Sequence, residues 1–111
     1  MTIQDKIPLL LKQAYELCSR IMPVKDCRLY GSYARGDYDD ESDVDIFVCV
    51  DLPEAALKQY RHAIAAINSN LSLTYDVTVS ITVKTAETVA RFSAFVPYYQ
   101  NVLREGKSYA G

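Results

Sequence analysis

Two carboxylates set two residues apart are the clearest chemical signal in this chain of 111 residues. Asp43 and Asp45 open the run 43–50, whose alternating valines and isoleucine predict a strand with both aspartates on the face opposite those apolar residues. Two like charges about 5 Å apart repel by roughly 3 kcal/mol at an effective dielectric of about 20. Binding of a cation would relieve that cost, and Mg²⁺, which combines a few carboxylates with water and phosphate oxygens, suits the pair. For either aspartate alone, a solvated strand start is the alternative.

A glycine–serine turn precedes the carboxylates. Residues 27–30 form a short apolar run that stops at Gly31, as a buried strand does. Gly31 lets the chain turn sharply and lets a ligand approach the backbone. Ser32 is a favoured N-cap for a helical turn over residues 33–35, and N–H groups at a helix start suit phosphate. On its own, the same pattern is also that of an ordinary strand-to-helix turn.

Ten residues, 33–42, separate the Gly-Ser pair from Asp43. With this spacing the chain resembles the minimal nucleotidyltransferases of the DNA-polymerase-β-like superfamily, whose motif is Gly-Ser, ten residues, then Asp-x-Asp. Residues 29–36 look like the phosphate turn of that family and residues 42–46 like its metal strand, although Tyr30 stands where Phe is more common. The resemblance implies an α/β (α+β) fold, a small mixed β-sheet with helices packed on one face. We expect residues 1–111 to form a single domain.

The resemblance also implies roles for particular residues. Asp43 and Asp45 would hold two divalent ions, Mg²⁺ or alternatively Mn²⁺, together with a third acid from a later strand. We place that acid at Asp76, which would also draw the proton from the attacking hydroxyl. The expected binding residues for ATP are Gly31, Ser32, Arg35 and Ser42.

Four further acids lie in the segment between the two motifs: Asp37, Asp39, Asp40 and Glu41. We interpret them as a solvated loop. Arg35, close by, would either contact triphosphate oxygens or balance the acidic loop, and the sequence leaves both interpretations open.

The elements that must position these residues follow from hydrophobic spacing. Apolar residues at helical spacing predict one helix over about 2–22 and another over 54–68, which Asn68-Ser69-Asn70 would end. Residues 71–84 alternate and predict a strand, with Asp76 on its polar face. Thr85 can cap a further helix, and residues 98–105 predict the last one.

Composition bounds the class of protein. A net charge of −2, with 50% hydrophobic and 23% charged residues, is ordinary for a soluble globular protein and argues against broad binding to DNA. No apolar run approaches twenty residues and no signal-peptide pattern is present, so we expect no membrane association and a cytoplasmic location. Cys18, Cys27 and Cys49 sit in apolar runs and are expected to be reduced core thiols. We assign no role to His62, the only histidine.

By resemblance, the expected activity is transfer of AMP from ATP to an acceptor hydroxyl. Stand-alone members of this family are often encoded beside a HEPN toxin, a helical ribonuclease, and act as its antitoxin by transferring AMP to one of its tyrosines. We therefore expect a HEPN-type toxin as partner. Two alternatives stay open: a non-catalytic nucleotide-binding module that masks a partner, and a small-molecule nucleotidyltransferase subunit. A homo-oligomer is also compatible with the sequence, which locates no interface for it.

Overall fold

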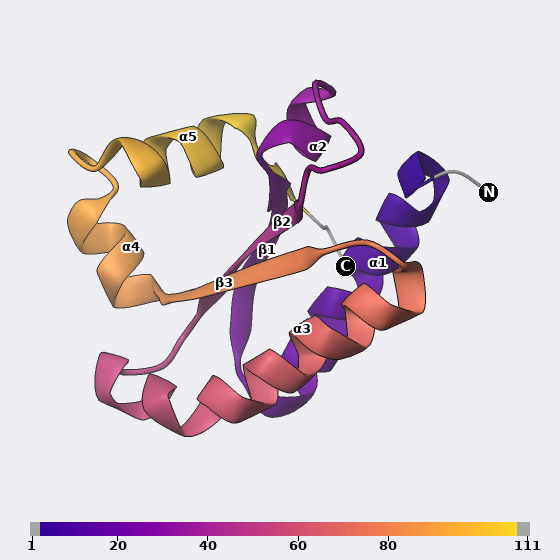
Figure 1. Cartoon of the computed structure of the whole chain (residues 1–111). Coiled ribbons are helices and arrows are strands. Elements are labelled where there is room, and N and C mark those ends of the chain that lie inside the picture. The colour runs from indigo at the N-terminus through magenta and orange to yellow at the C-terminus, as the bar shows by residue number, and fades with distance from the viewer. Residues whose placement is uncertain (1–2, 109–111) are drawn as a thin grey trace.

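The computed structural model describes residues 3–108, in which a mixed four-stranded sheet lies between two groups of helices (Figure 1). The elements in chain order are α1 (Ile3–Ile21), β1 (Val24–Tyr30), α2 (Ser32–Arg35), β2 (Val44–Val50), the 3-10 helix η1 (Glu54–Tyr60), α3 (Arg61–Tyr75), β3 (Val79–Thr85), α4 (Ala86–Phe92), α5 (Pro97–Glu105) and β4 (Lys107–Ser108). The strand order is β3-β2-β1-β4; β1 runs antiparallel to β2 and β4, whereas β2 and β3 are parallel. The predicted α/β fold with a small mixed sheet is confirmed.

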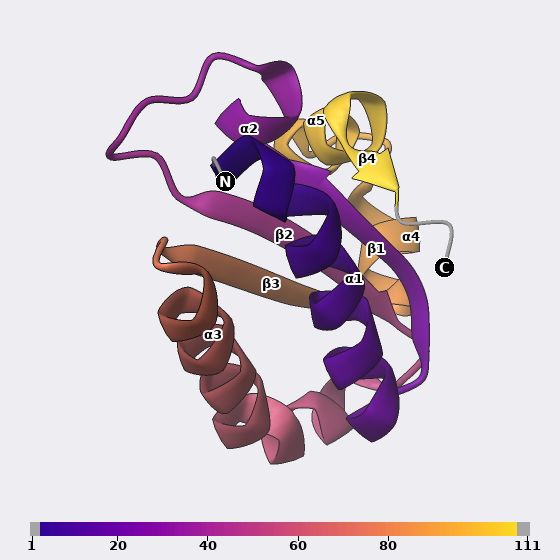
Figure 2. The ribbon, with the colours of Figure 1, turned by 90° about the vertical axis from the view of Figure 1, so that its right-hand side faces the viewer.

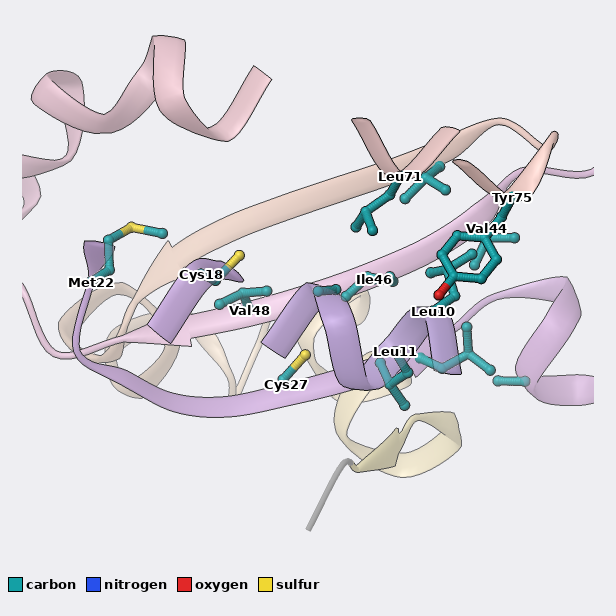
Figure 3. Close-up of a cluster of buried hydrophobic side chains, with 14 of the residues drawn as sticks. Leu10, Leu11, Cys18, Met22, Cys27, Val44, Ile46, Val48, Leu71 and Tyr75 are labelled. Carbon is teal, nitrogen blue, oxygen red and sulfur yellow. The ribbon is translucent and has the colours of Figure 1, made fainter. Parts of the chain in front are cut away.

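Helices α1 and α3 cover one face of the sheet (Figure 2). The predicted alternation of β2 is confirmed, since Val44, Ile46 and Val48 are fully buried against these helices. Figure 3 shows them together with Leu10 of α1 and Leu71 of α3. This apolar layer fixes which side of β2 faces the helices, so Asp45 must face the other side.

Helices α4 and α5 cover the other face of the sheet (Figure 1). The prediction that helices pack on one face of the sheet is therefore incomplete, since it did not include this second group. Phe47 and Cys49 of β2 form a second buried cluster there with Tyr99 and Val102 of α5. Both faces of β2 are therefore apolar beyond its first residues. Asp45, at the start of the strand, is only half-buried.

The predicted helix break at residues 68–70, and the strand beginning at residue 71, are wrong. Helix α3 continues to Tyr75, and β3 begins only at Val79. Leu71 and Tyr75 alternate with polar residues as a strand would, but they are one helical turn apart and both pack into the core.

The asparagine expected to end α3 instead protects the sheet edge. The side-chain oxygen of Asn68 accepts a hydrogen bond from the N–H of Ile81 at 3.0 Å, and the Ser72 hydroxyl accepts one from the N–H of Val79 at 2.9 Å. These N–H groups lie on the free side of edge strand β3. Since an unpaired strand edge invites association, the two side chains close part of it.

The three cysteines are free and buried, as predicted. Burial raises the pKa of the Cys18 thiol to about 11 and that of Cys27 to about 12, so both stay protonated at neutral pH. Within the described part of the chain, every helix is too short or too polar to span a bilayer.

Candidate active site

The start of β2 brings together residues from three strands. In the register of the sheet, Asp45 lies opposite Tyr30 of β1 on one side and Ser80 of β3 on the other. Asp43 is exposed and stands just before the strand, where the next N–H, that of Val44, donates to the carbonyl of Thr78 at 2.8 Å. The two aspartates therefore lie at one end of the sheet, where β2 is held by β1 on one side and by β3 on the other.

Gly31 is packed directly against the second aspartate. Its φ of 76° lies in the region that favours glycine, and a Cβ there would stand 2.6 Å from Oδ2 of Asp45. Helix α2 begins at Ser32, so Gly31 is the N-cap and the prediction that Ser32 caps this turn is wrong. The first N–H groups of a helix have no acceptor within it, so the start of α2, next to Asp45, leaves donors that suit a phosphate.

The environment of Asp45 favours a bound cation. Burial raises the pKa of Asp45, the nearby charge of Asp43 raises it further, and Arg35 lowers it. The carboxylate is thus held where its charged form is costly. Two carboxylates beside a helix start match the ligands that Mg²⁺ takes together with phosphate oxygens and water.

Arg35 balances the acidic loop, which is one of the two interpretations that the sequence left open. Its Nε lies 3.2 Å from Oδ2 of Asp37, and its side chain is 45% exposed. It also acts electrostatically on Asp45. The guanidinium therefore balances the acidic loop and lies within electrostatic reach of the carboxylate site.

Asp76 does not lie on the polar face of a strand, and that prediction is wrong. It ends α3 in a left-handed conformation, with a φ of 53°, and is exposed. Instead it borders a hollow with Asp40, Glu41 and Ser42. Within residues 3–108, no three His, Cys, Asp or Glu side chains are grouped closely enough to hold a metal ion. The β3 neighbour of Asp45 is the uncharged Ser80.

Ser42 organises the acidic loop. Its hydroxyl accepts from the N–H of Asp39 at 2.9 Å and donates to Oδ1 of Asp39 at 3.2 Å, and the N–H of Glu41 donates to the same oxygen at 2.9 Å. The four acids of the loop are exposed, as predicted, and this turn gives the loop a definite shape. Ser42 therefore sets the approach of the chain to Asp43.

Two tyrosines that the sequence reasoning left aside hold the same loop to the body of the protein. The rings of Tyr33 and Tyr38 stack at 4.2 Å, and the Tyr38 hydroxyl donates to Oε1 of Gln4 in α1 at 3.2 Å. The signal in the sequence that could have indicated this stacking is the presence of two tyrosines five residues apart, just after Gly31-Ser32.

A chain of hydroxyl groups lies beside Asp45 on the same face. The Tyr98 hydroxyl of α5 donates to the Tyr30 hydroxyl at 3.2 Å, which lies 3.5 Å from Oγ1 of Thr82. Burial raises the pKa of Tyr98, so its hydroxyl stays a donor. Through this contact α5 covers the sheet face next to Asp45, at the level of Thr82 and Phe47. Sequence reasoning placed Tyr98 in the last helix without a function.

Fold and site together define a class of protein: a mixed sheet that carries a glycine–serine turn against a carboxylate pair. The family model described as nucleotidyltransferase domain matches residues 11–103. This chain belongs to the nucleotidyltransferase domain family.

Two proteins of Methanocaldococcus jannaschii are similar in sequence. "Putative protein adenylyltransferase MJ0141" is 51% identical over 53 residues, which are 47% of this chain and 50% of that protein. "Putative protein adenylyltransferase MJ0604" is 33% identical over 84 residues, which are 76% of each. The match to the first relative thus spans half of its length.

Solved structures share the fold. One described as a "putative minimal nucleotidyltransferase" superposes with a TM-score of 0.62 at 23% identity, covering 94% of this chain and 93% of that one. A toxin–antitoxin crystal structure with AMP-PNP gives a TM-score of 0.57 at 22% identity, covering 87% of this chain and 69% of that one. These similarities support the placement of the sheet and helices.

Proposed function

We propose that this protein is a metal-dependent adenylyltransferase that moves AMP from ATP to a hydroxyl group of a partner protein. The observation that carries the proposal is the packing of Gly31 against Asp45, because it brings the start of α2, where phosphate would bind, beside a carboxylate. Asp43 and Asp45 would hold Mg²⁺, or Mn²⁺ in its place. When bound, the metal ion stabilises charge on the attacking and leaving oxygens.

The residues of the chain divide the remaining work. Ser32, at the start of α2, binds the β- and γ-phosphates through its N–H and its hydroxyl. Arg35 neutralises phosphate charge from the same helix. The α-phosphorus is attacked by the acceptor oxygen, a new P–O bond forms, and pyrophosphate leaves. Ser42 keeps the loop in the shape that delivers Asp43.

The acceptor we propose is a tyrosine hydroxyl. Asp76 is displaced from the strand and Ser80 stands beside Asp45, so the described chain offers no third carboxylate on that strand to take the proton. A phenol, with a pKa of about 10, gives up its proton to water more readily than an aliphatic alcohol does. This chemistry supports a tyrosine.

The partner we propose is a HEPN-type toxin, which this protein would neutralise as an antitoxin in the cytoplasm. Two observations support it: both M. jannaschii relatives carry the name protein adenylyltransferase, and toxin–antitoxin structures share the fold. We further propose that residues 1–111 act as one domain, without DNA or a membrane as a partner, and that any homo-oligomer is incidental to the reaction.

A second candidate is a nucleotide-binding module that neutralises its partner by masking it. The neutral Ser80 in the position beside Asp45 favours this candidate, because loss of an acid there would leave binding intact while slowing transfer. A small-molecule nucleotidyltransferase subunit has no comparable observation in its favour.

Label transfer separates the candidates. Purified protein and Mg²⁺ are added to lysate of the source cell with ATP labelled at either the α- or the γ-phosphate. The adenylyltransferase predicts a protein band labelled only from α-labelled ATP, with AMP on a tyrosine by peptide mass spectrometry. Label on a serine or threonine would contradict the phenol argument. An unlabelled lysate with ATP still bound would favour the masking module.

A further inference from the structure

A second hollow lies on the sheet face opposite Asp45, toward the other end of β3. It encloses about 310 Å³, and its apolar lining comes from η1, α3 and β3: Leu57, Ile64 and Val83. All three side chains are half-buried. We call this feature the distal hollow.

The rim of the distal hollow is basic. Lys58 and Arg61 are exposed, and neither forms an ion pair in the part of the chain that the structure describes. Lys84 and Arg91 lie close enough to lower the pKa of Glu54. Arg91 is paired with Glu87 at 3.1 Å, so the basic groups that the hollow itself presents are Lys58 and Arg61.

The one acid on the rim is already engaged. Oε2 of Glu54 accepts hydrogen bonds from the hydroxyls of Thr85 and Thr88, both at 2.8 Å. These bonds are the main cause of its lowered pKa. Glu54 is turned toward the start of α4, which leaves the two cations of the rim for a ligand.

The outer edge of β3, which pairs with no other described strand, borders this hollow at Val83. Asn68 and Ser72 occupy the outward N–H groups of Ile81 and Val79. Alternation along a strand turns the N–H of Val83 toward the same side, beyond the reach of those two bonds. An extended segment in the hollow would therefore find a backbone donor next to its apolar floor.

We propose that the distal hollow docks an acidic segment of a partner protein, with an apolar side chain on the floor and carboxylates on Lys58 and Arg61. Charge complementarity favours this occupant over a basic segment. The proposal is independent of nucleotidyl transfer. Asp45 faces the other side of the sheet, and Val83 lies three residues beyond its neighbour Ser80, about 10 Å along the strand.

The test uses the absence of tryptophan from this chain. A synthetic peptide of alternating leucine and glutamate with one central tryptophan is titrated with the full chain, and its fluorescence reports binding. A matched peptide with lysine in place of glutamate is the comparison. We expect binding of the acidic peptide only, weakened at least tenfold by raising NaCl from 50 to about 500 mM.

Charge reversal locates the site. The double variant Lys58→Glu/Arg61→Glu should lose acidic-peptide binding at least tenfold and gain binding of the lysine peptide. The control Arg20→Glu/Lys25→Glu makes the same charge change at exposed positions of α1 and β1 and should bind like the wild type. If the reversed variant fails to fold by circular dichroism, Lys58→Gln/Arg61→Gln replaces it.

Three results would overturn the proposal. Equal weakening by the control variant would mean general electrostatic attraction. Unchanged binding by both rim variants would place the peptide elsewhere. Sedimentation showing a wild-type dimer that the rim variants dissociate would make a second copy the occupant. Asp45→Asn should bind the peptide normally, so a failure of catalysis stays separate from a failure of docking.

Discussion

Oδ2 of Asp45 occupies the space beside Gly31 that any side chain at position 31 would need, 2.6 Å from the Cβ position. The turn at Gly31 and the carboxylate strand are therefore one packed unit, although thirteen residues separate Gly31 from Asp45 in the sequence. The contact explains in physical terms why glycine stands at this turn.

Replacing Gly31 by alanine should abolish transfer. The new Cβ must displace the Asp45 carboxylate, and the φ of 76° strains any other residue by about 1–3 kcal/mol. We expect at least a hundredfold loss of labelling and a lower melting temperature.

Gly36→Ala is the matched control for that variant. Gly36 also has a positive φ, 89°, but a Cβ there meets nothing within 4 Å. It should destabilise the fold by about 1 kcal/mol and keep most of the transfer activity. Equal loss of activity in both variants would make backbone strain, and not the Asp45 contact, the cause.

Metal binding should be visible without turnover. Mg²⁺ together with AMP-PNP should raise the melting temperature of the wild type, because ligands that bind only the folded state stabilise it. Asp43→Asn and Asp45→Asn should each lose the part of this shift that requires Mg²⁺. Asp76→Asn, at the end of α3, should keep the shift. A loss in Asp76→Asn would restore that residue to the metal site.

The stability of the metal-free protein should depend on pH through Asp45. Burial and the charge of Asp43 raise the pKa of Asp45 above its ordinary value of 3.8. The folded state therefore binds this proton more tightly than the unfolded chain does. Stability from this group is therefore lost as pH rises through the raised folded value. With EDTA present, Asp45→Asn should melt higher than the wild type at pH 7, by a margin that shrinks toward pH 4. A margin independent of pH would contradict this assignment.

The covered edge of β3 makes a separate stability prediction. Asn68→Ala removes the acceptor for the Ile81 N–H and should cost about 1–3 kcal/mol in the free energy of unfolding, measured in urea. The control is Asn70→Ala, two residues further along α3 at an exposed position. It loses only a hydrogen bond from the Thr74 hydroxyl and should cost less than about 1 kcal/mol. Similar costs for the two variants would contradict the assignment of Asn68 as a residue that protects the edge of β3.

The sequence allowed a good prediction of the elements around Asp45 and a poor one of those around Asp76. Apolar alternation in β2 and the Gly-Ser turn are local patterns, so the strand and the helical turn could be predicted, although the N-cap is Gly31 and not Ser32. Asp76 could not, because Leu71 and Tyr75 fit a strand period and a helical period equally, and the core contacts that decide between them are tertiary. The bond between Tyr30 and Tyr98 joins residues 68 apart, beyond any local pattern.

The most direct test of the central claim is the stoichiometry of the reaction with a co-purified partner. Attached AMP and released pyrophosphate are measured together for the wild type and for Asp45→Asn. We predict one pyrophosphate for each AMP attached to the partner, with both products lost in the variant. Attachment without pyrophosphate release, or equal attachment by Asp45→Asn, would contradict transfer at this carboxylate site.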